Sequence, residues 1–202
     1  MTPEQPLDNG LTPWQRKHLR LEITHPSVQT MADAVEAFAG RWFRREPSQR
    51  LLVLSGITGC GKTHCLHAIE RVASLLSVTA YTGLRWPHPP TLWSVEWPRV
   101  VATCDDSTED SVLTDCNDAD LLLVDEIGAE SDRYRSGHST GLLASLLNRR
   151  IDTPGLYTLI TTNVPPSEWS SRWDARIENR LLRGSVVVDL SDAPSYTTIQ
   201  PL

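Results

Sequence analysis

The feature that most constrains this chain is a glycine-rich segment that follows the short apolar run Leu51–Leu54. It reads Gly56-Ile57-Thr58-Gly59-Cys60-Gly61-Lys62-Thr63 and matches the pattern G-x-x-x-x-G-K-[ST] in full. Glycines at these positions let the backbone curl so that successive N–H groups point inward as a nest for an anion. The helix that follows adds the positive end of its dipole. The segment therefore predicts a phosphate-binding loop between a strand and a helix.

The polar residues at the end of this segment have the chemistry that a nucleotide triphosphate needs. Lys62 is placed to reach the β and γ phosphates, and Thr63 supplies a hydroxyl to Mg²⁺. His64 follows directly and completes the predicted ATP-binding residues. A glycine-rich turn that matches the pattern by chance is the alternative. The strand before it and the helix after it favour the functional interpretation.

A second apolar run, Leu121–Val124, ends in two adjacent carboxylates, Asp125 and Glu126. At the end of a strand, Asp125 can orient Mg²⁺ and its waters. Glu126 is placed to polarise an attacking water, which is the role of a general base. A strand that ends in Asp-Glu is common by itself, but the phosphate-binding loop upstream favours function. Adjacent Asp and Glu favour hydrolysis over phosphoryl transfer to a small molecule.

A third polar strand end is Thr161-Thr162-Asn163, after a run that begins at Leu156. Asn163 at such a tip would lie beside the γ-phosphate and could hold the attacking water. Asparagine before Val-Pro-Pro is also a common turn former, which is the alternative.

The order of apolar segments indicates the fold class. Strands are predicted at 51–54, 91–95, 121–124, 156–161 and 185–190, and helices at 31–42, 63–76, 140–151 and 174–184. Apolar strands that alternate with helices predict a parallel sheet covered on both faces. With 202 residues, 40% hydrophobic and 22% charged, the chain is expected to form one three-layer α/β domain.

The last predicted helix carries a row of arginines. Arg176, Arg180 and Arg183 share one face, at i, i+4 and i+7. Like charges at this spacing repel, so such a face either meets anions or is solvated. The γ-phosphate bound by a neighbouring subunit is a suitable anion, and the arginine would then act in trans.

A candidate contact for single-stranded nucleic acid follows the second carboxylate-bearing strand. Arg133-Tyr134-Arg135 places an aromatic ring between two cations, which suits stacking on bases and pairing with phosphates. An ordinary exposed loop is the alternative. The net charge of −6 argues against coating nucleic acid through general positive charge, while a local basic track is compatible with it.

Composition also bears on the compartment. The four cysteines show no paired C-x-x-C spacing, which indicates reduced thiols in a cytoplasmic protein. No apolar run approaches the roughly 18 residues of a membrane span, and residues 1–10 do not resemble a signal peptide. We therefore expect no membrane association.

Together these residues resemble the DnaC-type bacterial helicase loaders and the IstB-type transposition ATPases, a branch of the AAA+ superfamily. The resemblance spans about Trp42 to Tyr196. It rests on Gly56–Thr63, Leu122–Gly128, Leu147–Arg150, Thr161–Asn163 and Arg176–Leu181.

The resemblance implies a sheet of order 5-1-4-3-2, ATP bound between subunits, and a head-to-tail homo-oligomer assembled as a ring or spiral on single-stranded DNA. By position, Lys62 and Thr63 are similar to the Walker A pair, and Asp125 and Glu126 to the Walker B pair. Asn163 resembles sensor 1. Arg180 resembles the arginine finger, with Arg176 as its helper.

The chain also departs from that family. About fifty residues precede the first strand, fewer than a separate helicase-gripping domain needs, so we expect an arm and leading helix over 1–45 and the ATPase domain over 46–202. The segment Pro194–Thr198 lacks the arginine expected at sensor 2, and no C-terminal helical lid is expected.

The resulting hypothesis is a DnaC-like ATPase that binds and hydrolyses ATP with Mg²⁺, oligomerises on single-stranded DNA and loads or remodels a replicative helicase, or acts on a recombinase. Two alternatives stay open. One is an IstB-like targeting ATPase on duplex DNA, and the other is a nucleotide-dependent regulator that hydrolyses little.

Overall fold

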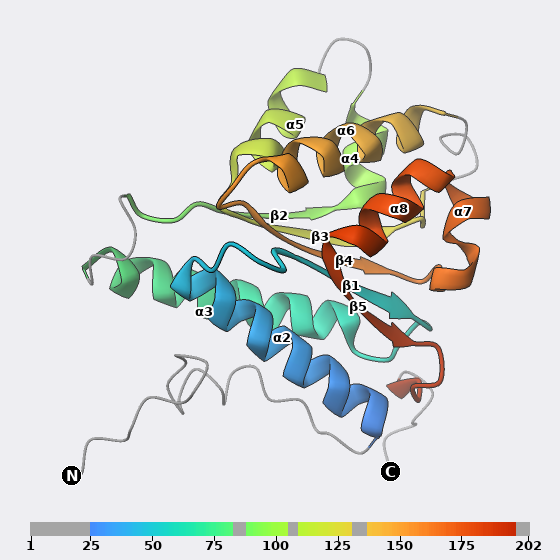
Figure 1. The fold of residues 1–202 in the computed structure, drawn as a ribbon, viewed down its shortest axis with the longest axis horizontal. Helices are drawn as coiled ribbons and strands as arrows, with labels where there is room; N and C mark the ends of the chain where they lie inside the picture. Colours follow the sequence, from blue (N-terminus) through green and yellow to red (C-terminus); the bar gives the residue numbers. More distant parts are fainter. Residues whose placement is uncertain (1–24, 83–87, 105–108, 131–136, 197–202) are drawn as a thin grey trace.

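A five-stranded parallel sheet forms the centre of the part of the chain that the structure describes. The structure is a computed structural model, and it describes residues 25–82, 88–104, 109–130 and 137–196. The strands are β1 (Leu51–Gly56), β2 (Leu92–Glu96), β3 (Leu121–Ile127), β4 (Tyr157–Thr162) and β5 (Ser185–Leu190). Their order is β2-β3-β4-β1-β5 (Figure 1), so the order 5-1-4-3-2 is confirmed. Each of the five predicted strands is present, with its bounds shifted by a few residues at most.

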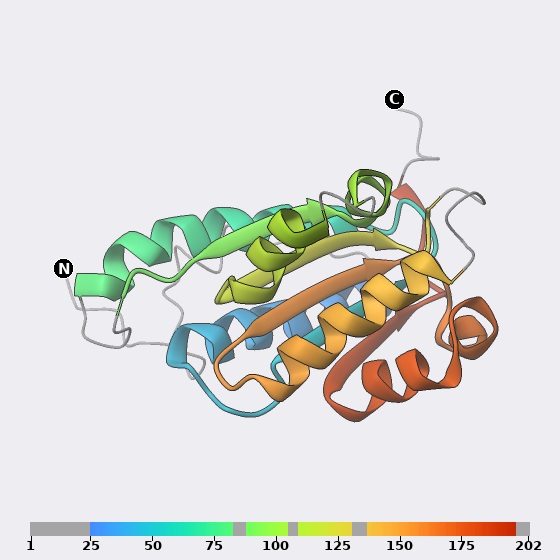
Figure 2. The ribbon, with the colours of Figure 1, turned by 90° about the horizontal axis from the view of Figure 1, so that it is seen from above.

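Helices cover both faces of this sheet, which confirms the three-layer arrangement (Figures 1 and 2). One face packs against α2 (Pro26–Arg44) and α3 (Lys62–Thr82). The other carries α4 (Trp97–Thr103), α5 (Glu109–Asp118), α6 (His138–Asp152), α7 (Trp169–Arg172) and α8 (Ala175–Arg183), and a 3₁₀ turn, η2 (Pro166–Glu168), precedes α7.

The alternation of side chains along the strands explains why there are two cores. Leu52 and Leu54 of β1 point into the core under α2 and α3, whereas Leu51 and Val53 point into the core under α6 and α8. Strands β1 and β4 are buried along their whole length, and β3 is buried at every residue except Glu126. The two edge strands, β2 and β5, are less buried, and Trp93 of β2 is 41% exposed.

Several short helices lie where the sequence predicted none. The helices α4, α5 and α7 are 7, 10 and 4 residues long, too short for a 3.6-residue period to stand out. Helix α8 matches the helix predicted at 174–184, and Asp174 is its N-cap residue. Asp174 accepts hydrogen bonds from the backbone N–H groups of Arg176 (2.8 Å) and Ile177 (2.9 Å).

The strand order decides where the polar strand ends meet. Strands β3, β4 and β1 are neighbours and run parallel, so their carboxyl ends lie at one edge of the sheet. A crevice outside that edge is where open α/β sheets bind ligands.

Candidate nucleotide-binding site

A cavity of about 310 Å³ lies at this edge of the sheet, and it joins three motifs that are far apart in the sequence. The glycine-rich loop lines it together with Glu126 from the end of β3 and Asn163 from the end of β4. The full lining is Thr58, Gly59, Gly61, Lys62, Thr63, His64, Glu126, Thr161 and Asn163.

The loop adopts the curled backbone that its glycines predict. Gly56, Gly59 and Gly61 have φ values of 151°, 83° and 100°, a region that side chains disfavour. Gly56 also lies against β5, because a Cβ there would come within 2.5 Å of the Leu190 Cβ. Both conformation and close packing therefore require glycine at the start of the loop.

Lys62 is folded back into the loop. Its Nζ donates to the carbonyls of Gly56 (2.8 Å) and Ile57 (2.7 Å) and lies 3.6 Å from the Sγ of Cys60. Burial lowers the pKa of Lys62, while Cys60, Asp125 and Glu126 act to raise it. To reach a phosphate, Nζ must exchange these carbonyls for phosphate oxygens.

The residues predicted to serve Mg²⁺ lie side by side. The Thr63 hydroxyl donates to Oδ1 of Asp125 at 3.3 Å, and Asp125 is 8% exposed. Hydroxyl and carboxylate oxygens are hard donors that fit Mg²⁺, which takes few protein ligands and relies on nucleotide phosphates and water for the rest. Among the described residues no group of three or more His, Cys, Asp or Glu could hold a metal by itself.

Glu126 has an unusual backbone. Its φ is 60°, and the register of β3 on β4 shifts between Val124 and Ile127. This bulge takes Glu126 out of the regular ladder. Its exposed side chain lines the cavity.

The sequence predicts no role for Thr161, which is buried beneath this bulge with 1% exposure. Its hydroxyl donates to Oδ1 of Asp125 and accepts from the backbone N–H of Glu126 (2.9 Å). The only signal in the sequence was its place two residues before Asn163.

A buried ion pair braces the turn that follows β3. Glu130, 1% exposed, accepts from Arg172 of α7 (2.6 Å) and from Ser139 of α6 (2.7 Å). At Gly128 in the same turn φ is 90°, and a Cβ would come within 2.7 Å of Val164 Cγ2. The turn is thereby fastened to the segment after β4.

The arginine row lies apart from this cavity. Arg176, Arg180 and Arg183 line a separate hollow of about 440 Å³ beside the end of α6. Within one chain the structure does not bring Arg176 or Arg180 to the glycine-rich loop. Arg133, Tyr134 and Arg135 lie outside the described residues.

All four cysteines lie within the described residues, and they are buried and form no disulfide. Burial raises the pKa of Cys65 to about 12 and that of Cys116 to about 11. Cys60 is fully buried, so it can serve a nucleotide only through its backbone.

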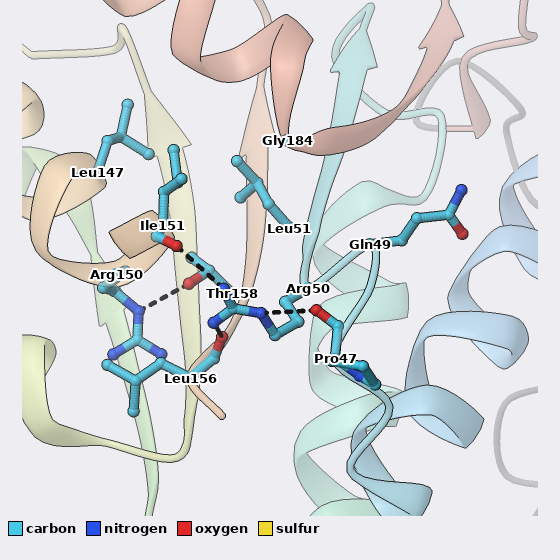
Figure 3. Close-up of a pocket in the computed structure, with 10 residues that line it drawn as sticks. All are labelled: Pro47, Gln49, Arg50, Leu51, Leu147, Arg150, Ile151, Leu156, Thr158 and Gly184. Atoms are coloured by element: carbon cyan, nitrogen blue, oxygen red, sulfur yellow. Dashed lines mark hydrogen bonds between the residues drawn. The ribbon is translucent and has the colours of Figure 1, made fainter. Parts of the chain in front are cut away.

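At the opposite end of the sheet a hollow of about 220 Å³ contains two arginines (Figure 3). Arg50 donates to the carbonyls of Pro47, Leu156 and Ile151. Arg150 donates to the Thr158 hydroxyl and to carbonyls. Both guanidinium groups are occupied by the protein, which gives this hollow a structural role.

The strand order and the glycine-rich loop give this chain the P-loop fold of AAA+ domains. The DnaC helicase loader structure matches with a TM-score of 0.65 and 16% identity over 88% of this chain and 99% of that one. The DnaI structure matches with a TM-score of 0.62 and 20% identity over 86% of this chain and 93% of that one. AMPPCP-bound DnaA from Aquifex aeolicus matches with a TM-score of 0.62 and 15% identity over 83% of this chain and 47% of that one.

At identities this low, the structural matches show a shared fold and nothing more, and the chain spans about half the length of that DnaA. No protein-family model matches the sequence, and a comparison with curated proteins finds no match. In the described part of the chain, no helix is long and apolar enough to span a membrane.

Proposed function

We propose that this chain binds and hydrolyses Mg·ATP in the cavity at the ends of β1, β3 and β4. The observation that carries the proposal is the lining of that cavity, where Lys62 and Thr63 face Glu126 and Asn163. An anion nest, a cation, a carboxylate and an amide in one place are the groups that phosphoryl transfer to water requires.

Each residue has a distinct task in this proposal. The N–H groups of the loop and Lys62 hold the phosphates, which keeps the reacting phosphorus in line with a water. Asn163 holds that water, and Glu126 accepts its proton. Thr63 and Asp125 would hold Mg²⁺, which would supply neutralisation of phosphate charge.

The proposal includes a head-to-tail homo-oligomer in which Arg180, helped by Arg176, acts on the neighbour's ATP. The hollow lined by Arg176, Arg180 and Arg183 supports it, because three cations on one side of a short helix surround a space away from their own loop. Such a surface suits an anion presented by a second subunit.

We further propose that the assembly forms on single-stranded DNA and acts on a replicative helicase or a recombinase. A DnaA structure with this fold holds AMPPCP and single-stranded DNA, and a DnaC structure with this fold is a helicase loader. Arg133, Tyr134 and Arg135 are the proposed DNA contact.

ATP turnover measured without DNA, with single-stranded DNA and with duplex DNA tests this function. The proposal expects Mg²⁺-dependent turnover that single strands stimulate most. Stimulation by duplex alone would favour a transposition-targeting ATPase. Tight ATP binding with little turnover under all three conditions would indicate a regulatory protein.

A further inference from the structure

The hydroxyl of Thr161 connects the two carboxylate residues of the site. It donates to Oδ1 of Asp125 and accepts from the N–H of Glu126 at 2.9 Å. A hydroxyl has one donor and two acceptor lone pairs, so one group can make both bonds at once. Because Thr161 is 1% exposed, water cannot readily replace either of them.

The bulge in β3 explains why such a group is needed. The strands pair regularly up to Val124 and resume only at Ile127, opposite Thr162. Across the gap, two threonine hydroxyls of β4 bond to the bulged strand. Thr161 accepts from the N–H of Glu126, and the Thr162 hydroxyl donates to the carbonyl of Ile127 at 2.7 Å.

The backbone of Glu126 must be held in place. A φ of 60° is sparsely populated for a residue with a Cβ, and it persists only where the surroundings enforce it. The bond from its N–H to Thr161 is one such restraint. A second restraint is the hydrogen bond that the carbonyl of Glu126 accepts from the N–H of Ala129 at 3.2 Å.

We propose that Thr161 is a positioning residue for both carboxylates. By donating to Asp125, it fixes the carboxylate that faces the Thr63 hydroxyl and so orders the Mg²⁺ ligands. By accepting from Glu126, it holds the backbone whose side chain enters the cavity. The inference rests on the proposed function, since it assigns Thr161 a part in Mg·ATP binding and hydrolysis.

Three variants separate positioning from simple packing. Thr161→Val keeps the shape and removes both hydrogen bonds, whereas Thr161→Ser keeps the hydroxyl. Thr158→Val is the matched control. Thr158 is a buried threonine at the other end of β4, and its hydroxyl accepts from Arg150 at 2.7 Å.

Two quantities are measured for each variant: the Mg²⁺ concentration needed for half-maximal binding of a fluorescent ATP analogue, and kcat at saturating Mg·ATP. Removing a group that orients metal ligands typically lowers metal affinity or activity by about 10–100-fold. Thr161→Val should therefore need an Mg²⁺ concentration about tenfold higher or more for half-maximal binding, and its kcat should fall by about 10–100-fold. Thr161→Ser should stay near wild type in both, and Thr158→Val should change only the melting temperature.

Wild-type Mg²⁺ dependence and kcat in Thr161→Val would overturn the assignment, as would equal losses in Thr161→Ser or Thr158→Val. If Thr161→Val does not fold, Thr161→Ala is measured in its place against the same expectations. A wild-type chain that binds Mg·ATP without turnover would refute hydrolysis alone, and the Mg²⁺ titration would still decide the role of Thr161. A wild-type chain that binds no nucleotide would end both proposals.

Discussion

Two adjacent arginines near the end of α6 should differ greatly in their effect on stability. Arg150 is 2% exposed and donates to the carbonyls of Cys116 (2.6 Å), Asn117 (3.3 Å) and Tyr157 (2.6 Å) and to the Thr158 hydroxyl (2.7 Å; Figure 3). Burial lowers the pKa of Arg150 to about 10, which leaves it charged at neutral pH. It thereby ties α6 to β4 and to the end of α5.

The expected loss follows from these contacts. In Arg150→Ala four acceptors lose their donor, three of them in buried hydrogen bonds, at about 1–3 kcal/mol each. Removing a desolvated cation offsets part of that sum, so the net loss should be about 3–5 kcal/mol. In a chain of this length that lowers the melting temperature by about 6–20 °C.

Arg149→Ala is the matched control. Its side chain is 58% exposed and lies 3.6 Å from Asp118 in a surface ion pair, which is worth about 0–1 kcal/mol. Urea unfolding followed by tryptophan fluorescence gives both free energies. If the two variants differ by less than about 1 kcal/mol, the role assigned to Arg150 is wrong.

Three further predictions concern the loop, the thiols and the assembly. In urea unfolding, Gly56→Ala should lose about 2 kcal/mol or more of unfolding free energy, because its Cβ would clash with β5. Gly141→Ala in α6 is the control and should lose none, because the space around its Cβ is open. Equal losses in the two variants would contradict this packing. At pH 8 the native protein should react slowly with thiol reagents, since burial raises the pKa of Cys65 to about 12. The reaction should become rapid only in denaturant, and fast labelling of the native protein would contradict that burial. Arg180→Ala and Lys62→Ala should each be inactive, yet their mixture should regain ATPase activity in proportion to mixed interfaces. Mixed oligomers that form and stay inactive would place Arg180 outside a shared site.

The sheet could be predicted because its signals are local. Each strand is a short apolar run, and the glycine-rich loop fixes the first strand and helix on either side of it. The shorter helices α4 and α7 could not be found in this way. Their lengths of seven and four residues give at most two turns, and contacts with the sheet decide their conformation.

The roles of Thr161 and Arg150 show what a sequence pattern leaves out. Thr161 gains its role only through the pairing of β3 with β4 and the bulge between them. The sequence contains only a weak indication that Arg150 is buried: it lies three residues after Leu147 and four after Leu146, on the apolar face of α6. An arginine there reads as solvated until its carbonyl partners are seen.

The measurement that tests the central claim most directly compares ATP binding and turnover in the wild type, Lys62→Ala and Glu126→Gln. The wild type should hydrolyse Mg·ATP. Glu126→Gln should bind ATP with wild-type affinity while kcat falls by about 10²–10⁴-fold, the usual effect of losing a positioned base. Lys62→Ala should lose affinity. Turnover by Glu126→Gln at the wild-type rate would contradict the account, because hydrolysis would then not depend on the carboxylate that the bulge of β3 places in the cavity.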